Sequence, residues 1–379
     1  MAFNIATVTL LEAATITERL IGVTNKPIFL WGAPGIGKSA IVREIVKRLA
    51  ETTGHRWGLI DARASQLAAV DTRGVPTVTK RGETSFAIPA WLPRVERDGE
   101  FGILLLDEFM LATPSVQAAF YQLLHERQLG DYELPDGWDV IAASNRPEDG
   151  AGVHGRIDTA VTGRFATHLN ITPDVDEVLE YANANNWDER LYAFLDYRGR
   201  PTLRGDGEIE TAGLIHQYPD GGAPKGHIAI ATPRTWAAVN DILRAELPAD
   251  LQHAAFEGAV GKGAAAEFTG FLAVFEGISD VSVILHDPDR ATVPFELSTQ
   301  YATTVILAKR CTEENIGNAV SFIKRMDDEL LSIFFKVLTM RDEAFFNTAE
   351  YTQFKIDNNI PLSGSVSEPL TTRVVTIWD

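Results

Sequence analysis

The sequence predicts an α/β fold in which a parallel sheet is followed by a mostly helical domain. Up to about residue 171, short apolar runs alternate with segments of helical periodicity, a pattern typical of parallel sheets. After residue 174, the apolar residues recur at helical spacing instead. With 379 residues, of which 45% are hydrophobic, the chain is long enough for two domains. We therefore expect an αβα domain over residues 1–172, a helical domain over 173–350 and a C-terminal tail over 351–379.

Five apolar runs are the expected strands of the sheet, and helical periodicity fills the spaces between them. The strands are expected at residues 27–32, 57–61, 102–107, 138–144 and 165–171, and the helices at 38–50, 114–127 and about 156–163. Two stretches interrupt this order with turn residues between short β-prone pieces, and we interpret both as inserted hairpins: residues 73–93 and 127–138. Residues 198–231 are rich in Gly and Pro and are expected to form a loop.

The composition narrows the classes of function. A single cysteine, Cys311, excludes an internal disulfide framework and any zinc site built from several cysteines, and we expect it to be a small buried residue. The net charge of −18 opposes attraction to phosphate backbones, which makes nucleic acid an unlikely partner. No apolar run is long enough to span a bilayer and no basic stretch precedes the first apolar residues, so we expect a cytoplasmic protein.

A glycine-rich turn between the first strand and the first helix fits the phosphate-binding pattern G-x-x-x-x-G-K-[ST]. Its glycines let backbone N–H groups converge on a phosphate, Lys38 reaches the β- and γ-phosphates, and Ser39 ligates Mg²⁺ at a helix N-terminus. A chance glycine-rich turn is the alternative, but the flanking strand and helix supply the context that the pattern needs. The expected nucleotide-binding residues are Gly32, Ala33, Pro34, Gly35, Ile36, Gly37, Lys38, Ser39 and Ala40.

A pair of carboxylates follows the apolar strand at residues 102–107. Asp107 is suited to hold Mg²⁺ together with Ser39, and Glu108 to orient and deprotonate a water molecule aimed at the γ-phosphate. Such a pair alone is as common in a helix cap or a solvated turn. Beside a phosphate-binding loop, it indicates hydrolysis of a nucleotide by water.

Asn145 ends the next apolar run, in the sequence VIAASNRPEDG. Because the carboxyl ends of parallel strands surround the ligand crevice, Asn145 is placed to hydrogen-bond the γ-phosphate or the attacking water. A turn-forming Asn before Arg-Pro is the simpler interpretation when the residue is taken alone. Its position beside the other two elements favours the site.

Together these segments resemble the AAA+ ATPases of the MoxR branch, and more narrowly the members encoded beside a protein with a von Willebrand factor A-like domain. The resemblance rests on GAPGIGKS, LLLDEF, SNRPED, GRIDTAVTGRF and TPRTW; it is dense over residues 15–245, looser to about 350 and absent from the tail. It implies an ATP- and Mg²⁺-dependent homo-oligomer, a hexameric ring, whose helical domain is a lid. It also implies a von Willebrand factor A-like partner and places the two hairpins, the helix-2 and pre-sensor-1 inserts, at the ring's pore.

The resemblance assigns roles to further residues. Lys38 and Ser39 match Walker A, Asp107 and Glu108 match Walker B, and Asn145 matches sensor 1. Arg234 in TPRTW matches sensor 2. A cation in the first turn of a helix, after Pro233, is unfavourable without an anion, and a nucleotide fits that need.

The family also uses an arginine finger that faces the γ-phosphate of a neighbouring subunit. Arg164 in VTGRF is the better match, and Arg156 in HGRID is the competitor. By default, an arginine at a helix end is a dipole partner or a surface ion pair. The sequence therefore leaves the choice between the two open.

The favoured function is a ring ATPase that remodels or activates a partner protein. The main alternative is an AAA+ nucleic-acid translocase or restriction-type motor, which the acidic composition disfavours. A small-molecule kinase is disfavoured by the Asp-Glu tandem and by a separate helical domain bearing Arg234. A scaffold that binds ATP without hydrolysing it is disfavoured by Glu108.

Overall fold

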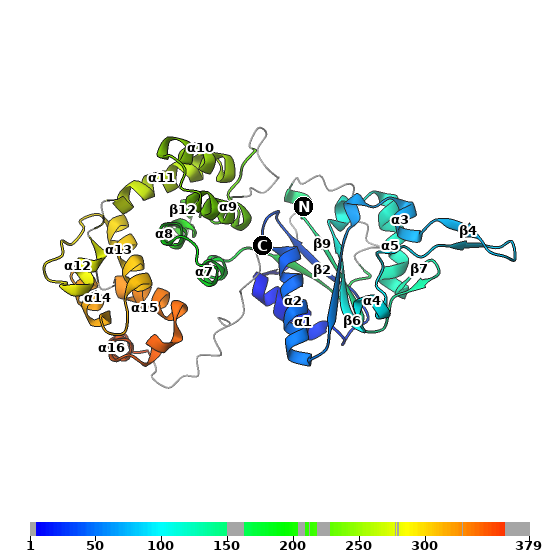
Figure 1. The fold of residues 1–379 in the computed structure, drawn as a ribbon, viewed down its shortest axis with the longest axis horizontal. Helices are drawn as coiled ribbons and strands as arrows, with labels where there is room; N and C mark the ends of the chain where they lie inside the picture. The colour runs from blue at the N-terminus through cyan, green and yellow to red at the C-terminus, as the bar shows by residue number, and fades with distance from the viewer. Residues whose placement is uncertain are drawn as a thin grey trace. The chain divides into compact units, whose positions relative to one another are not determined.

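The computed structural model describes residues 5–149, 163–203, 209–211, 213–217, 228–276, 278, 280–327 and 329–360. These residues belong to two compact units, which divide after Asp174. Figure 1 shows the strands of a twisted sheet in the first unit and helices in the second.

A six-stranded, entirely parallel sheet forms the centre of the first unit. In spatial order its strands are β1 (Thr7–Val8), β10 (Thr167–Ile171), β2 (Ile28–Gly32), β9 (Trp138–Ser144), β6 (Phe101–Asp107) and β3 (Trp57–Arg63). The five expected strands are all present, so the predicted α/β class is confirmed. The sixth strand, β1, was not predicted, because two residues are too few to show a periodicity.

The central strands are apolar throughout because both faces of the sheet are covered. Alternate residues of β2, Phe29 and Trp31, pack in one core with residues of helix α5 (Pro114–Glu126) such as Phe120. On β2, the residues between them point to the opposite face. Helix α2 (Lys38–Thr53) contacts β2, β3 and β6, and α1 (Leu10–Leu20) packs on α2. The sheet therefore holds the carboxyl ends of its strands at one rigid edge.

Both predicted hairpins are present in the first unit. The first joins β4 (Pro76–Val78) to β5 (Thr84–Phe86), the second joins β7 (Gln128–Leu129) to β8 (Tyr132–Glu133), and both are antiparallel. Tyr132 Oη donates to the carbonyl of Pro93 at 2.7 Å, and the backbone N–H of Phe86 donates to Asp131 Oδ2 at 3.2 Å. The bond between Phe86 and Asp131 joins the two hairpins at one end of the unit, and the bond from Tyr132 fixes the second hairpin to the segment that follows the first (Figure 1).

Short helical segments complete the first unit. They are α3 (Ala69–Arg73), α4 (Val95–Asp98) and 3-10 turns at Ala64–Gln66, Phe109–Leu111 and Pro147–Asp149. Residues 156–162 of the helix expected at 156–163 lie outside the described residues.

The second unit is helical, as predicted, and its core is aromatic. Phe194, Trp236, Phe256 and Phe268 pack against one another there. Its helices are α7 (Val175–Ala184), α8 (Glu189–Arg198), α9 (Pro233–Arg244), α10 (Ala249–Val260), α11 (Lys262–Glu276), α12 (Val281–His286), α13 (Leu297–Arg310), α14 (Ile316–Ile323), α15 (Glu329–Arg341) and α16 (Ala349–Asp357), with a 3-10 helix at Glu343–Asn347.

The region expected to be a loop, residues 198–231, differs from the prediction. It contains an antiparallel pair, β11 (Thr202–Leu203) and β12 (Ile209–Thr211). Strands this short cannot be told from a loop when Gly and Pro surround them. Cys311 is buried, as predicted, at the end of α13.

Among the helices of the described residues, none is long and apolar enough to cross a membrane.

Candidate active site

The phosphate-binding loop lies between the carboxyl end of β2 and the first turn of α2. Gly35 and Gly37 have φ angles of 79° and 94°, a left-handed conformation that glycine adopts without strain. No side chain caps the start of α2. Its first N–H groups and the positive end of its dipole are therefore available to an anion.

Gly32 is required by close packing. A Cβ at this position would lie 2.4 Å from Ile36 Cδ1 and 2.8 Å from the carbonyl oxygen of Ile171 on β10. The second of these is a backbone atom of a neighbouring strand and cannot move aside. Because Gly32 has no side chain, the loop can begin directly beside the neighbouring strand at the edge of the sheet.

Lys38 reaches back across the loop that precedes it. Its Nζ donates to the carbonyl oxygens of Gly32 at 2.7 Å and Ala33 at 2.9 Å, and to Asn145 Oδ1 at 3.0 Å. The side chain is buried, at 8% exposure. A buried ammonium at the mouth of a loop of N–H groups is suited to bind phosphate oxygens.

Ser39 and Asp107 meet across the site. Ser39 Oγ donates to Asp107 Oδ2 at 2.5 Å, and the other carboxylate oxygen, Oδ1, accepts the N–H of Glu108 at 2.8 Å. A hydroxyl beside a carboxylate is a set of hard oxygen ligands of the kind that Mg²⁺ prefers. The described residues contain no cluster of three or more His, Cys, Asp or Glu side chains arranged to hold a metal.

Glu108 has an unusual backbone and a specific side-chain partner. Its φ of 53° places it in the left-handed region, which is uncommon for a residue with a side chain. Its Oε2 accepts a hydrogen bond from Ser65 Oγ, just after β3. Ser65 is not among the residues predicted from the sequence, because its only signal is that β3 lies next to β6 in the sheet.

Asp61 on β3 is a second residue that is not among those predicted from the sequence. Burial, and after it the charge of Asp107, raise the pKa of Asp61, while the Arg43 guanidinium at 3.2 Å acts in the opposite direction. The site therefore has a third carboxyl group, and the negative charge of the neighbouring Asp107 disfavours its ionised form. Arg43 on α2 balances part of this negative charge.

The turn after β9 holds Asn145 in place beside Lys38. Arg146 donates to Asp149 from its backbone N–H, at 2.8 Å to Oδ2, and from its guanidinium, at 2.8 Å to Oδ1. Asp149 is buried. The sequence motif NRPED is therefore a closed turn that fixes the end of β9. The structure brings Lys38, Ser39, Asp107, Glu108 and Asn145 together at one edge of the sheet.

A match to a family model covers this edge. Residues 27–165 match the AAA domain of the dynein-related subfamily. The chain carries an AAA+ ATPase domain. The matched range of the AAA+ domain begins just before β2 and ends just before β10, so it includes the phosphate-binding loop, both carboxylates and Asn145.

Other comparisons are more distant. No curated protein matches the chain. Among solved structures, NtrX from Brucella abortus is 13% identical with a TM-score of 0.38, covering 88% of this chain and 69% of its own. A mutant RuvB from Thermotoga maritima is 15% identical with a TM-score of 0.35, covering 79% of this chain and 80% of its own.

A closed-state Hsp104 reconstruction with ATPγS and FITC casein is 16% identical with a TM-score of 0.34, covering 53% of this chain and 38% of its own. Likenesses this distant support no conclusion about what the chain binds.

The three predicted arginines have different surroundings. The Arg164 guanidinium packs over the Tyr121 ring of α5, with Cζ 5.1 Å from the ring centroid, and its buried Nε has no hydrogen-bond partner. Arg156 lies outside the described residues. Arg234 is exposed in the first turn of α9, in the second unit. The roles of all three remain predictions.

Proposed function

We propose that this chain is an ATP-hydrolysing motor of the MoxR type, assembled as a hexameric ring, that remodels or activates a partner protein. The observation that carries the hydrolytic part is the meeting of Lys38, Ser39, Asp107, Glu108 and Asn145 at the carboxyl edge of the parallel sheet. The loop and Lys38 bind the phosphates. Asn145 holds Lys38 from the far side and is placed to contact the γ-phosphate.

Glu108 is the proposed general base. Both oxygens of Asp107 accept hydrogen bonds, from Ser39 and from the backbone, whereas the bond from Ser65 occupies only Oε2 of Glu108, so Glu108 is the carboxylate of the pair that is placed to accept a proton from water. Mg²⁺, when bound by Ser39 and Asp107, would supply positive charge to the phosphate oxygens. Arg234 and one of Arg164 and Arg156 are the proposed cationic partners of the nucleotide.

The two hairpins support a protein partner. Exposed apolar side chains line the β4–β5 hairpin and its base: Val75 at 58%, Val78 at 77%, Phe86 at 38% and Ile88 at 42% exposure. A group of exposed apolar side chains indicates an interaction surface. The bond from the Phe86 N–H to Asp131 ties this hairpin to the β7–β8 hairpin. We refer to Val75, Val78, Phe86 and Ile88 as the hairpin patch.

The competing proposal is a nucleic-acid translocase. Lys80 and Arg81, both exposed, lie at the turn of the β4–β5 hairpin and are the observation in its favour. The chain's net charge of −18 opposes it. The cytoplasm is the proposed compartment.

A phosphate-release assay separates these functions. Turnover of ATP is measured for the protein alone, with single- and double-stranded DNA, and with a von Willebrand factor A-like protein from the same cells. We expect stimulation by the protein and none by DNA. The Glu108→Gln variant, loaded with ATP, should co-purify with that partner, whereas Lys38→Ala should not. Recovery of nucleic acid without protein would favour the translocase.

A further inference from the structure

The second unit contains an open cavity of about 520 Å³ that lies far along the chain from the phosphate-binding loop. Helices α7, α8, α13 and α15 and the turn between α7 and α8 form its walls. Its lining includes Asn183, Asp188, Glu189, Lys309 and Arg341.

Lys309, in the last turn of α13, is one of the residues that line this cavity. Its Nζ lies 3.9 Å from the centroid of the Tyr192 ring and donates to Asn183 Oδ1. Asn183 Nδ2 donates to the carbonyl of Met340 at 2.9 Å, which keeps the amide oxygen turned toward the lysine. The amine is thus held in one place by a neutral acceptor and an aromatic face.

The carboxylates around the cavity are paired with other cations. Asp188 accepts from Arg190 Nε at 2.8 Å and from Arg190 Nη2 at 2.6 Å, and Glu189 pairs with Arg310. Within the described part of the chain, Lys309 forms no ion pair. The charged form of Lys309 therefore has no directly paired carboxylate, and Glu189 and Asp196 favour it only through their charges.

Arg341 places a second positive charge beside Lys309. Its guanidinium donates to the carbonyls of Ala308 at 2.8 Å and Cys311 at 2.7 Å, so it is fixed against the C-terminal end of α13. Burial, and after it the charge of Arg341, lower the pKa of Lys309 to about 8, although Glu189 and Asp196 act in the opposite direction. About a tenth of Lys309 is therefore the neutral amine at pH 7.

We propose that Lys309 is a nucleophilic amine, and that this cavity is a site of covalent acylation by small anionic acyl donors of the acyl phosphate class. The cavity is large enough for such a molecule, and Arg341 supplies the positive charge that attracts its phosphate.

In the reaction, the lone pair of neutral Nζ attacks the acyl carbonyl carbon and forms a C–N bond. The C–O bond to the phosphate breaks, the phosphate leaves with that electron pair, and the extra proton on nitrogen passes to solvent. The product is an uncharged amide. Acylation removes a buried charge and its repulsion by Arg341, so the environment that lowers the pKa also favours the product.

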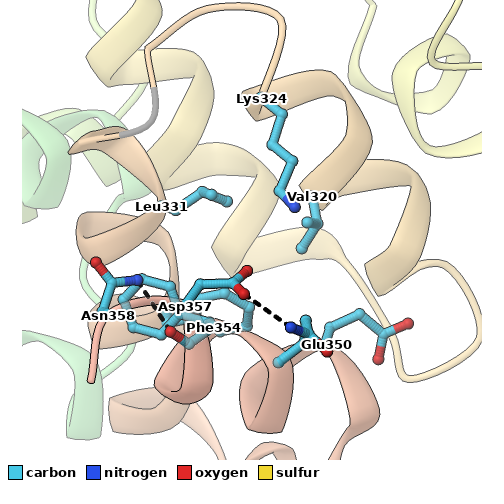
Figure 2. A pocket seen from close by; sticks show the side chains of 9 residues that line it. Val320, Lys324, Leu331, Glu350, Phe354, Asp357 and Asn358 are labelled. Carbon is cyan, nitrogen blue, oxygen red and sulfur yellow. Dashed lines mark hydrogen bonds between the residues drawn. The ribbon is translucent and has the colours of Figure 1, made fainter. Parts of the chain in front are cut away.

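Two lysines of the same unit are matched controls. Figure 2 shows Lys324 at another cavity, of about 470 Å³, with its side chain extended toward Val320, and Lys324 is exposed. Lys355 lies 4.9 Å from the Tyr351 ring centroid, so it has the aromatic contact of Lys309 but does not line the cavity of Lys309. One control tests for a cavity alone and the other for a ring contact alone.

The experiment treats the full-length protein briefly with acetyl phosphate and quantifies acetylation at each lysine by peptide mass spectrometry. At pH 7.5 an amine with a pKa near 8 is about a quarter neutral, and an ordinary lysine about a thousandth. We expect the initial rate at Lys309 to exceed those at Lys324 and Lys355 at least tenfold, with half of its maximum near pH 8. Arg341→Gln, if folded by circular dichroism, should slow acetylation at Lys309 severalfold.

Two results would overturn the proposal. The first is a rate at Lys309 no greater than at Lys355, or a rate that rises only above pH 10. The second concerns the class of donor. p-Nitrophenyl acetate serves as an uncharged acetyl donor for comparison, and inorganic phosphate serves as a competitor of acetyl phosphate. Inorganic phosphate should slow labelling by acetyl phosphate and leave labelling by the ester unchanged. A preference for Lys309 with the ester alone would contradict an anionic donor.

Discussion

Ser65 Oγ donates a hydrogen bond to Glu108 Oε2, and this contact joins the end of β3 to the end of β6. The two residues are 43 positions apart in the chain. Because β3 and β6 are neighbours in register, Arg63 lies beside Asp107, and the residues that follow each strand meet. The proposed base is therefore held by a hydroxyl from the adjacent strand.

This contact predicts the effect of Ser65→Ala. The hydroxyl occupies one carboxylate oxygen of Glu108, and its removal frees that oxygen to accept a proton from water. We expect ATP turnover without a partner to rise severalfold, as measured by phosphate release, with ATP affinity unchanged. Ser65→Thr keeps a hydroxyl and should behave like the natural protein. A tenfold fall in turnover would instead mean that Ser65 holds Glu108 in its productive position.

Glu108→Gln and Lys38→Ala should fail in different ways. The amide cannot accept the proton of water. Glu108→Gln should therefore bind ATP normally and hydrolyse it more slowly by about a hundredfold or more. Lys38→Ala removes the ammonium that donates to the loop and to Asn145, and ATP binding itself should be lost. Titration with a fluorescent ATP analogue, followed by phosphate release, measures both. Normal turnover of Glu108→Gln would exclude Glu108 as the base.

Arg164 is the preferred candidate for an arginine finger across a subunit boundary. A guanidinium supplied by a neighbour contributes about 10³ to 10⁵ in rate in related phosphoryl transfers, so Arg164→Ala should bind ATP and hydrolyse it very slowly. Mixing Arg164→Ala with Glu108→Gln should restore some phosphate release, since some interfaces then combine an intact Glu108 with an intact Arg164.

Three outcomes test this assignment. If Arg164→Ala is active and Arg156→Ala is not, Arg156 is the finger. If Arg164→Ala is inactive but mixing restores nothing, Arg164 acts within its own subunit, where it packs on Tyr121. If a strictly monomeric protein turns over ATP at the full rate, the ring itself is excluded.

The hairpin patch should matter for the partner and not for ATP binding. Val78 and Val23 are equally exposed, at 77%, but only Val78 lies on the β4–β5 hairpin. We expect Val78→Asp to reduce partner-stimulated turnover at least tenfold and to leave basal turnover intact, because a charge on the patch opposes apolar docking. Val23→Asp should change neither rate, and equal losses in both variants would exclude the patch as a docking surface.

Lys309 predicts a pH-dependent contribution to stability. Its pKa in the folded chain is about 8, below the value of 10.5 for an ordinary lysine. Between these two values the unfolded chain binds more protons, so stability rises with pH there, and the full cost of the buried charge is present below pH 8. Compared with Lys309→Met, the natural protein should gain about 1 to 3 kcal/mol between pH 7 and pH 10.

Urea unfolding of both proteins at several pH values measures this difference. The exposed Lys324→Met variant controls for the loss of one lysine. A difference in the free energy of unfolding that is constant with pH would contradict the assignment.

The sequence by itself determined the features that depend on neighbouring residues. The phosphate-binding loop, the Asp107–Glu108 pair and Asn145 each lie within one strand and the turn that follows it, so a local pattern reveals them. The five long strands are visible because burial on both faces requires unbroken apolar runs. The hairpins at 73–93 and 127–138 are visible because their turn residues interrupt such runs.

Only the tertiary structure decided which of these features meet. A periodicity reports that a side chain is buried, but it does not report the partner, because strand order depends on packing across the whole sheet. The order β1-β10-β2-β9-β6-β3 is what joins Ser65 to Glu108 and Asn145 to Lys38. The environment of Lys309 likewise comes from four helices between residues 175 and 341. Its lowered pKa depends on the burial and on the Arg341 charge that their packing creates, which no local stretch of sequence contains.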